Sequence, residues 1–349
     1  MTARTCGSGS FFAVDRRTWA RICDSLEMNE AVAYLVLACG TGRDNLTTSW
    51  SSQALHKYTG IAWERGKAAI ERLRQAGFIK LAEGHTQQRP RYELVPHKGA
   101  KGESETDNPI WLPNSIVTGT PSGEIPPVQR LRSAGDAWTL RLLVDLYHAQ
   151  NLRDDGGISP QILRENYAKK RINERSIYLI WGFKSAGQTL SWKGPFAAHQ
   201  KRTKKAEGHP VWDSVRLLNK MGLLTFVPHL YENSSAQAEP IHALGIGAKG
   251  EEPIETQIGE AADAAARALC QEWTFEQAED DGFKYFCPVS QSKPDAQLIG
   301  VARLLYRPRT QRTAAWYAHL QASGNQAIPY YEELARGKTL CDDVIAKRA

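Results

Sequence analysis

The side chains with the clearest chemical potential lie between residues 63 and 92 of the 349-residue chain. Lys and Arg donate hydrogen bonds to phosphate oxygens and to the acceptor edge of guanine. A carboxylate accepts a hydrogen bond from cytosine, and an alanine methyl group meets the methyl group of thymine. The candidate residues are Glu64, Arg65, Lys67, Ala68, Glu71, Arg72 and Arg74, followed by Gln88, Arg89 and Arg91. Side chains of these types are suited to hydrogen bonding with a nucleic acid rather than to bond-making chemistry.

A rigid element must present these residues, and the sequence predicts a helix, a turn and a second helix. Thr48 or Ser49 can cap the first helix by accepting a backbone N–H bond. Thr59-Gly60-Ile61 predicts the turn, because glycine tolerates the positive φ of a sharp bend and Ile61 can fill the angle between the helices. The second helix is expected from Trp63 to Ala76. Its expected buried face consists of Gly66, Ala69, Ile70 and Leu73.

A hairpin of two short strands is expected after Gly77, a residue type that commonly ends a helix. Residues 78–81 and 91–94 have strand character, and residues 84–88 have the composition of a turn. Two short amphipathic helices, at 18–26 and 29–39, are expected ahead of the helix-turn-helix pair.

This order of elements resembles the winged helix-turn-helix family of DNA-binding domains over residues 10–98. The resemblance implies that the helix at 63–76 enters the major groove and that the basic hairpin at 84–92 lies on the DNA backbone. It also implies that Arg65 and Arg74 lie beside phosphates. Two other interpretations remain open. The segment can be a helical hairpin that packs elsewhere, or its charges can form a solvated face, since Glu64 and Glu71 are spaced to pair with Lys67.

Residues 110–232 predict a second domain after a polar linker at 99–109. A helix is expected at 134–150, and Ser159-Pro160 predicts the start of another, PQILRENYAKK. The helix at 211–222 and the apolar strand after it repeat the order found in the first domain. This part therefore resembles a second, divergent winged helix with an insertion at 178–210. Its expected phosphate contacts are the loop residues Lys201, Arg202, Lys204 and Lys205, with Arg216 on the helix. Dimerisation, or support of the first domain, is the alternative role.

Residues 233–259 are expected to be a linker to a small domain at 260–349, with a helix at 261–276, strands at 283–305 and a helix at 313–321. Basic residues interleaved with aromatic ones fit nucleic-acid binding and a protein-interaction domain equally well. The basic residues in question are Arg303, Arg307, Arg309 and Arg312. The predicted fold class is therefore helix-rich α+β, with two winged helix-turn-helix domains and a small C-terminal α+β domain.

Charge and cysteine usage limit the classes of protein to consider. The net charge is +6, but residues 163–220 hold thirteen Lys/Arg against four Asp/Glu, and residues 251–281 hold ten acids and one base. Such a basic block is typical of phosphate contacts, although a solvated surface also explains it. The six cysteines have no CxxC spacing and the nine histidines are scattered, so no metal and no other cofactor is expected.

The sequence favours a non-enzymatic, sequence-specific binder of double-stranded DNA. The tandem resemblance is to replication initiators of plasmids and phages, and it suits a transcription regulator of a mobile element equally well. A protein–protein adaptor built on winged helices is the alternative, and a homodimer is compatible with these functions. A DNA-processing enzyme is disfavoured, because no histidine pair or carboxylate cluster has ligand spacing. Without a signal peptide or a bilayer-spanning apolar run, the predicted location is cytoplasmic, with no membrane partner.

Overall fold

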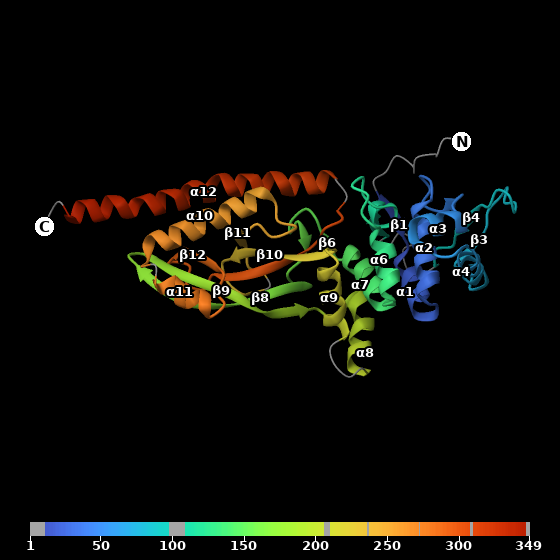
Figure 1. Cartoon of the computed structure of the whole chain (residues 1–349), viewed down its shortest axis with the longest axis horizontal. Coiled ribbons are helices and arrows are strands. Elements are labelled where there is room, and N and C mark those ends of the chain that lie inside the picture. The colour runs from blue at the N-terminus through green and yellow to red at the C-terminus, as the bar shows by residue number, and fades with distance from the viewer. Residues whose placement is uncertain are drawn as a thin grey trace. The chain divides into compact units, whose positions relative to one another are not determined.

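The computed structural model describes residues 11–97, 109–205, 210–235, 237–271, 273–307 and 310–346, and the side chains of all of these except 205 and 338–346. The fold is α+β, which confirms the predicted class at that level (Figure 1). Contacts group the chain into two compact units. Unit 1 contains residues 1–149, 192–223 and 306–309, and unit 2 contains residues 150–191, 224–305 and 310–349.

The N-terminal part of unit 1 is built around the apolar helix α2 (Met28–Cys39), which is buried from Glu30 to Cys39. Its other elements are α1 (Arg16–Ser25), β2 (Thr47–Thr48), α3 (Ser52–Thr59), α4 (Trp63–Gln75), β3 (Ile79–Leu81) and β4 (Tyr92–Leu94). The three strands form an antiparallel sheet in the order β2-β4-β3. The predicted helices and hairpin strands of this part are therefore confirmed, with shifts of a few residues at their ends.

Local signals start and stop these helices. The Asp15 side chain caps α1 by accepting a hydrogen bond from the Thr18 amide at 2.7 Å. Ser51, rather than the predicted Thr48 or Ser49, caps α3 by accepting from the Gln53 amide. Gly77 has a φ of +76°, so the chain leaves α4 through the left-handed conformation that favours glycine.

The remaining elements of unit 1 come from both sides of the predicted domain boundary. They are β1 (Phe11–Val14), β5 (Ile110–Pro113), α5 (Ser115–Thr118), α6 (Pro127–Ala134), α7 (Ala137–His148), the 3₁₀ turn η1 (Gly194–Phe196), α8 (Ala197–Lys205) and α9 (Pro210–Lys220). β5 pairs antiparallel with β1, which lies about a hundred residues earlier in the chain. The segment predicted to open a second domain at residue 110 thus belongs to the same unit as the first helices.

Unit 2 is a mixed α+β unit around one large sheet, with main strand order β11-β10-β13-β8-β9-β12. Its elements are β6 (Gln150–Asn151), β7 (Gly157–Ile158), β8 (Leu163–Arg175), β9 (Tyr178–Leu190), β10 (Leu224–Tyr231), β11 (Pro240–Ala243), α10 (Pro253–Leu269), α11 (Trp273–Asp280), β12 (Tyr285–Ser290), β13 (Gln297–Leu304) and α12 (Gln311–Ala346). In Figure 1, α10 and α12 lie side by side along this sheet. Phe183, Leu298, Ile258 and Leu320 belong to the shared core.

The segment PQILRENYAKK, which we predicted to be a helix, forms the start of β8 from Leu163 onward, so that prediction is wrong. Leu163 and Tyr167 are both buried, and their spacing of four residues imitates one face of a helix. The strand conformation depends on distant partners, because β8 pairs along its length with β9 and at Arg164–Asn166 with β13. Tertiary pairing has overridden the local pattern.

The C-terminal half of the chain also departs from the predicted division. The expected linker at 233–259 contains β11 and the start of α10, where Ile254 and Ile258 are buried. The strand after α9 was expected to belong to a second, divergent winged helix. Instead, β10 pairs along its whole length with β13, which lies beyond the predicted domain boundary at residue 260. The expected insertion supplies β9, a strand of the same sheet.

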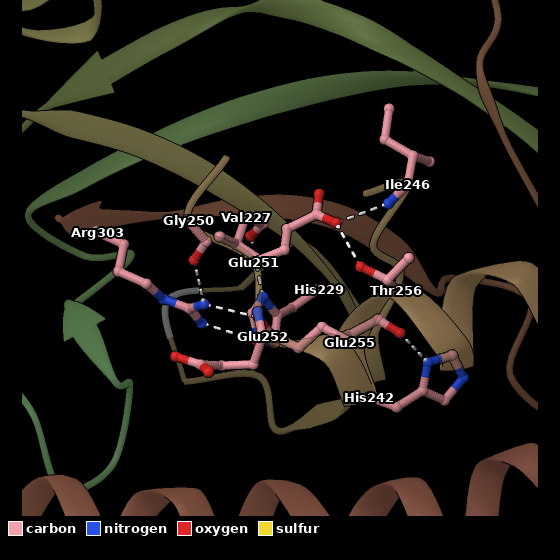
Figure 2. Close-up of polar contacts among 11 residues, drawn as sticks. Val227, His229, His242, Ile246, Gly250, Glu251, Glu252, Glu255, Thr256 and Arg303 are labelled. Carbon is pink, nitrogen blue, oxygen red and sulfur yellow. Dashed lines mark hydrogen bonds and ion pairs between the residues drawn. The ribbon is translucent and has the colours of Figure 1, made fainter. Parts of the chain in front are cut away.

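A buried ion pair joins the sheet of unit 2 to α10. Both guanidinium NH groups of Arg303 on β13 donate to the carboxylate of Glu255, at 2.7 and 2.8 Å, and both side chains are 0% exposed (Figure 2). His229 Nε2 lies 3.5 Å from the same carboxylate. Arg303 is one of the four basic residues considered for nucleic-acid or protein binding, and its burial removes it from either kind of surface. Of the other three arginines, Arg312 is exposed and Arg307 interacts with another residue of the chain. Arg309 lies outside the described residues.

The loop that follows β11 is rich in glycine and ends at the start of α10. Its sequence, GIGAKG at residues 245–250, has the spacing of loops that bind phosphate through backbone amides. Here the amides of Ile246 and Gly247 both donate to Glu251 Oε2 at 2.8 Å, and the Thr256 hydroxyl donates at 3.2 Å (Figure 2). The chain's own carboxylate therefore occupies these donors, and the loop has a structural role.

The buried histidine His242 predicts a loss of stability of unit 2 in mild acid. Burial lowers its pKa from 6.5 to about 4. The folded unit therefore keeps His242 neutral, whereas the unfolded chain takes up a proton below its pKa of 6.5. The free energy of unfolding of unit 2 should therefore fall by about 3 kcal/mol as the pH falls from about 6.5 to about 4. Urea unfolding of the chain at several pH values measures this loss.

The matched control for this prediction is His319→Gln, because His319 is an exposed histidine on α12. His242→Gln should flatten the dependence of the unfolding free energy on pH between about 6.5 and 4, whereas His319→Gln should leave it as steep as in the unaltered chain. An equally steep dependence in both variants would contradict the assignment to His242.

Candidate nucleic-acid interface

The turn between α3 and α4 is held by its own side chains. Gly60 has a φ of +68° and its amide donates to the His56 carbonyl at 3.0 Å. The Thr59 hydroxyl donates to the Leu55 carbonyl at 2.6 Å and accepts from the Ile61 amide at 3.3 Å. Ile61 is 2% exposed, so it fills the angle between the helices as predicted. These contacts fix the direction in which α4 leaves α3.

A contact from α6 supports the same turn. Arg132 Nε donates to the Thr59 carbonyl at 2.9 Å, next to the C-terminus of α3. A cation at this position also complements the partial negative charge of the helix end. The side chains of Gln129 and Arg132 lie over Gly60. The segment expected to belong to a second domain therefore buttresses the helix-turn-helix pair, and sequence reasoning did not identify Arg132.

α4 has one buried face and one exposed face. Its buried residues are Gly66, Ala69, Ile70 and Leu73, the set that the sequence predicts. The exposed residues are Trp63, Glu64, Arg65, Lys67, Ala68, Arg72, Arg74 and Gln75, while Glu71 is half-buried. Leu73 and Leu55 are fully buried, so the helix is anchored through its apolar side and presents the polar side outward.

Ion pairs within α4 neutralise part of its charge. Glu64 pairs with Lys67 at 3.1 Å, and Lys67 also lies over the Trp63 ring. Glu71 accepts two hydrogen bonds from Arg74, at 2.8 and 2.7 Å, which hold the pKa of Glu71 below its ordinary value. The two glutamates of α4 therefore pair with different cations. Glu64 pairs with Lys67 as considered, whereas Glu71 pairs with Arg74.

The two other arginines of α4 have different surroundings. Arg72 Nη2 forms an ion pair with Glu30 Oε1 on α2, where the Glu30 side chain is 1% exposed and that of Arg72 is 51% exposed. Among the described residues, Arg65 has no carboxylate within ion-pair distance. Arg65 is therefore the cation of α4 whose donors are most available. Sequence reasoning missed Glu30, since nothing in the spacing of residues 30 and 72 connects them.

The loop between β3 and β4 carries the other candidate residues of this part. Thr86 and Arg89 exchange backbone hydrogen bonds at 3.2 Å in both directions, which closes a tight turn with Gln88 inside it. The Arg91 amide donates to His85 Nδ1 at 3.0 Å. The side chains of Gln88, Arg89 and Arg91 are all exposed. The loop is thus an ordered, basic projection that follows α4 directly in the chain.

The candidate residues at 201–205 lie on α8 and not in a loop, which corrects that prediction. α8 is anchored through the buried His199, which is hydrogen-bonded to Asp145 on α7 at 2.9 Å. Arg202 lies over the Trp138 ring with its guanidinium carbon 5.2 Å from the ring centroid, so part of its role is packing. Lys201 and Lys204 are exposed, and the Lys205 side chain lies outside the described residues.

The last candidate, Arg216, lies on α9 and forms an ion pair with Asp213 one turn earlier. Its side chain is exposed. The helix predicted around it is confirmed, and the strand that follows, β10, pairs with β13 in the large sheet. α9, the helix that carries Arg216, is therefore not followed by a hairpin like the one after α4.

The arrangement on α4 and the β3–β4 loop combines an anchored helix, exposed donors and acceptors, and a basic hairpin.

In the part of the chain that the structure describes, no three His, Cys, Asp or Glu side chains are grouped to hold a metal ion. No helix of that part is both long and apolar enough to cross a membrane. Comparisons of the chain with protein-family models, curated proteins and solved structures found no match.

Proposed function

We propose that the chain is a sequence-specific double-stranded DNA-binding protein, in which α3, α4, β3 and β4 act as a winged helix-turn-helix. α4 enters the major groove and the β3–β4 loop lies along the DNA backbone. One observation carries the proposal. α4 is buried on its apolar side alone, and its exposed side presents donors and acceptors directly ahead of a basic loop.

The charges of α4 favour reading of bases over attraction by charge alone. Glu64 and Glu71 offset two of the four basic residues on this helix, so its net charge is small. A carboxylate near the DNA repels phosphates but accepts a hydrogen bond from cytosine, which makes it useful only at particular sequences. This mixture supports a specific site rather than uniform binding along the duplex.

The proposed context is a mobile element, with the protein acting in the cytoplasm as a replication initiator or a transcription regulator. This part of the proposal rests on the resemblance of the sequence to tandem winged-helix proteins, of which residues 10–98 keep the predicted helices and hairpin strands. It assigns no DNA contact to unit 2. α8 and α9 remain candidates for additional phosphate contacts, because Lys201 and Lys204 on α8 and Arg216 on α9 are exposed.

Removal of the two arginines of the β3–β4 loop should weaken binding to all duplex DNA alike. In Arg89→Ala/Arg91→Ala, up to two phosphate contacts are lost, so the slope of log K against log salt should fall by about one unit for each contact. Fluorescence anisotropy of labelled duplexes over a range of salt concentrations measures the slope. Lys293→Ala/Arg336→Ala, on unit 2, is the charge-matched control. An unchanged slope in the loop variant would exclude the loop from the interface.

The proposal as a whole is tested by titrating random-sequence duplex DNA with the purified full chain at low and moderate salt. A DNA-binding protein should bind at low salt and lose affinity steeply as salt rises, because counterions are released from the phosphates it contacts. A protein–protein adaptor would show weak binding with a shallow slope. That second result would reject DNA as the partner.

A further inference from the structure

We propose that Glu30, a residue too buried to touch DNA, sets the base preference of the α4 face by fixing the guanidinium group of Arg72. The inference rests on the proposed function and names the base that this part of the site selects. Glu30 lies on α2 and is 1% exposed, whereas Arg72 lies on α4 with 51% of its side chain exposed. The pair thus joins the core of unit 1 to the surface that we assign to DNA.

The two oxygen atoms of the Glu30 carboxylate have different contacts. Oε2 accepts a hydrogen bond from the Glu27 amide at 3.2 Å as part of the capping box of α2, and Oε1 faces Arg72 Nη2. A buried carboxylate needs a partner, because desolvation of an unpaired charge is costly. Arg72 supplies that partner through an ion pair, so its guanidinium group lies beside a carboxylate that is buried on α2.

The other ion pairs of α4 lack this property. In Glu64–Lys67 the two side chains are 82% and 53% exposed, and in Glu71–Arg74 both are 45% exposed. Pairs between exposed side chains are weak unless they are bidentate, as Glu71–Arg74 is, and both of these pairs lie within α4 itself. Arg72 is therefore the α4 cation that a buried carboxylate of another helix orients before any ligand arrives.

A fixed guanidinium group has a defined chemical preference. Arginine carries five N–H donors in a planar fork, and the contact with Glu30 leaves donors for a second partner. In the major groove the fork matches the O6 and N7 acceptors of guanine, which is the commonest specific contact of arginine. Because Arg72 is already oriented, it loses little conformational freedom on binding. The ligand of this position is a G·C base pair with its guanine facing Arg72.

The experiment compares the sites that the full chain and its variants select from random duplex DNA. Arg72→Ala should lower the preference for guanine at one position by about tenfold, since a bidentate contact of this kind discriminates by that order. Glu30→Gln should lower the preference at the same position and leave the other positions unchanged. In Arg72→Ala/Glu30→Gln the second change should add nothing, because Glu30 acts through Arg72.

Two further variants separate positioning from a general loss of folding. Glu255→Gln removes a carboxylate of unit 2 that, like Glu30, is buried and paired with an arginine. This variant should lower the melting temperature without altering the base preference. Arg72→Lys keeps a cation beside Glu30 but lacks the fork, so it should lose the guanine preference while unit 1 stays folded.

The outcomes distinguish this inference from the proposed function. If the unaltered chain selects a site but Glu30→Gln or Arg72→Lys keeps every base preference, Glu30 is only a structural anchor and the inference is overturned. The inference is also overturned if Glu30→Gln changes the preference in the Arg72→Ala background. If the unaltered chain selects no site at all, the proposed function fails and the inference fails with it.

Discussion

A chain with Arg65→Ala and Arg72→Ala should bind its preferred duplex roughly 30-fold or more weakly than the unaltered chain. Each arginine that contacts a base or phosphate contributes about 1–3 kcal/mol, which gives about 2–6 kcal/mol for the pair. The two contributions should add, because seven residues of helix separate them by about 10 Å and they share no partner. Fluorescence anisotropy with the selected duplex and with random duplex measures both affinities.

The comparison of the two duplexes assigns the roles of these arginines. Replacement of Arg65, which has no carboxylate within ion-pair distance among the described residues, should weaken binding to both duplexes. Arg72 should weaken mainly the preferred one. The control with the same loss of charge is Arg267→Ala/Arg336→Ala on α10 and α12 of unit 2. An equal loss of affinity in this control would mean that net charge, and not the α4 face, determines binding.

Arg303→Ala should destabilise unit 2 by about 3–5 kcal/mol, the largest stability effect expected from a single substitution here. The change leaves the buried Glu255 carboxylate without its cation. Burial by itself raises the pKa of Glu255, but the hydrogen bonds and charge of Arg303 outweigh burial and hold that pKa below its ordinary value. Urea unfolding followed by circular dichroism measures the loss in free energy.

The dependence on pH identifies the cause of this loss. With Arg303 present, Glu255 contributes stability above its unfolded pKa of 4.5, and the contribution disappears as the pH falls through the lower folded pKa. Without Arg303, burial dominates, and acid should partly restore the variant relative to the unaltered chain. Arg303→Met/Glu255→Leu, which removes both charges, should lose much less stability. A similar loss in both variants would show that packing against Trp316, and not charge, is responsible.

Elements with local signals could be predicted from the sequence. The helix over 63–75 and the turn at Gly60 depend on residues within a few positions of each other, namely a plugging isoleucine, a buried face of matching period and a stop glycine. The strands at 285–290 and 297–304 were likewise visible as apolar runs. Their place in a sheet with β8, β9 and β10 was not, because strand order is decided by partners far away in the chain.

The same distinction explains the candidate site. The exposed face of α4 follows from helical spacing, so Arg65, Lys67 and Ala68 could be identified in advance. The ion pair of Arg72 with Glu30 could not be identified in advance. Glu30 lies 42 residues earlier on another helix, and a charged residue is not expected to be buried. Arg132, which supports the turn at Thr59, lies beyond a predicted domain boundary and was missed for the same reason.

The central claim is that α4 reads double-stranded DNA, and selection of the purified full chain on random duplex DNA tests it most directly. The account predicts recovery of a defined sequence of a few base pairs per helix, with at least one guanine whose preference disappears in Arg72→Ala. Recovery of no enriched sequence at low salt, by a chain shown to be folded, would contradict the account.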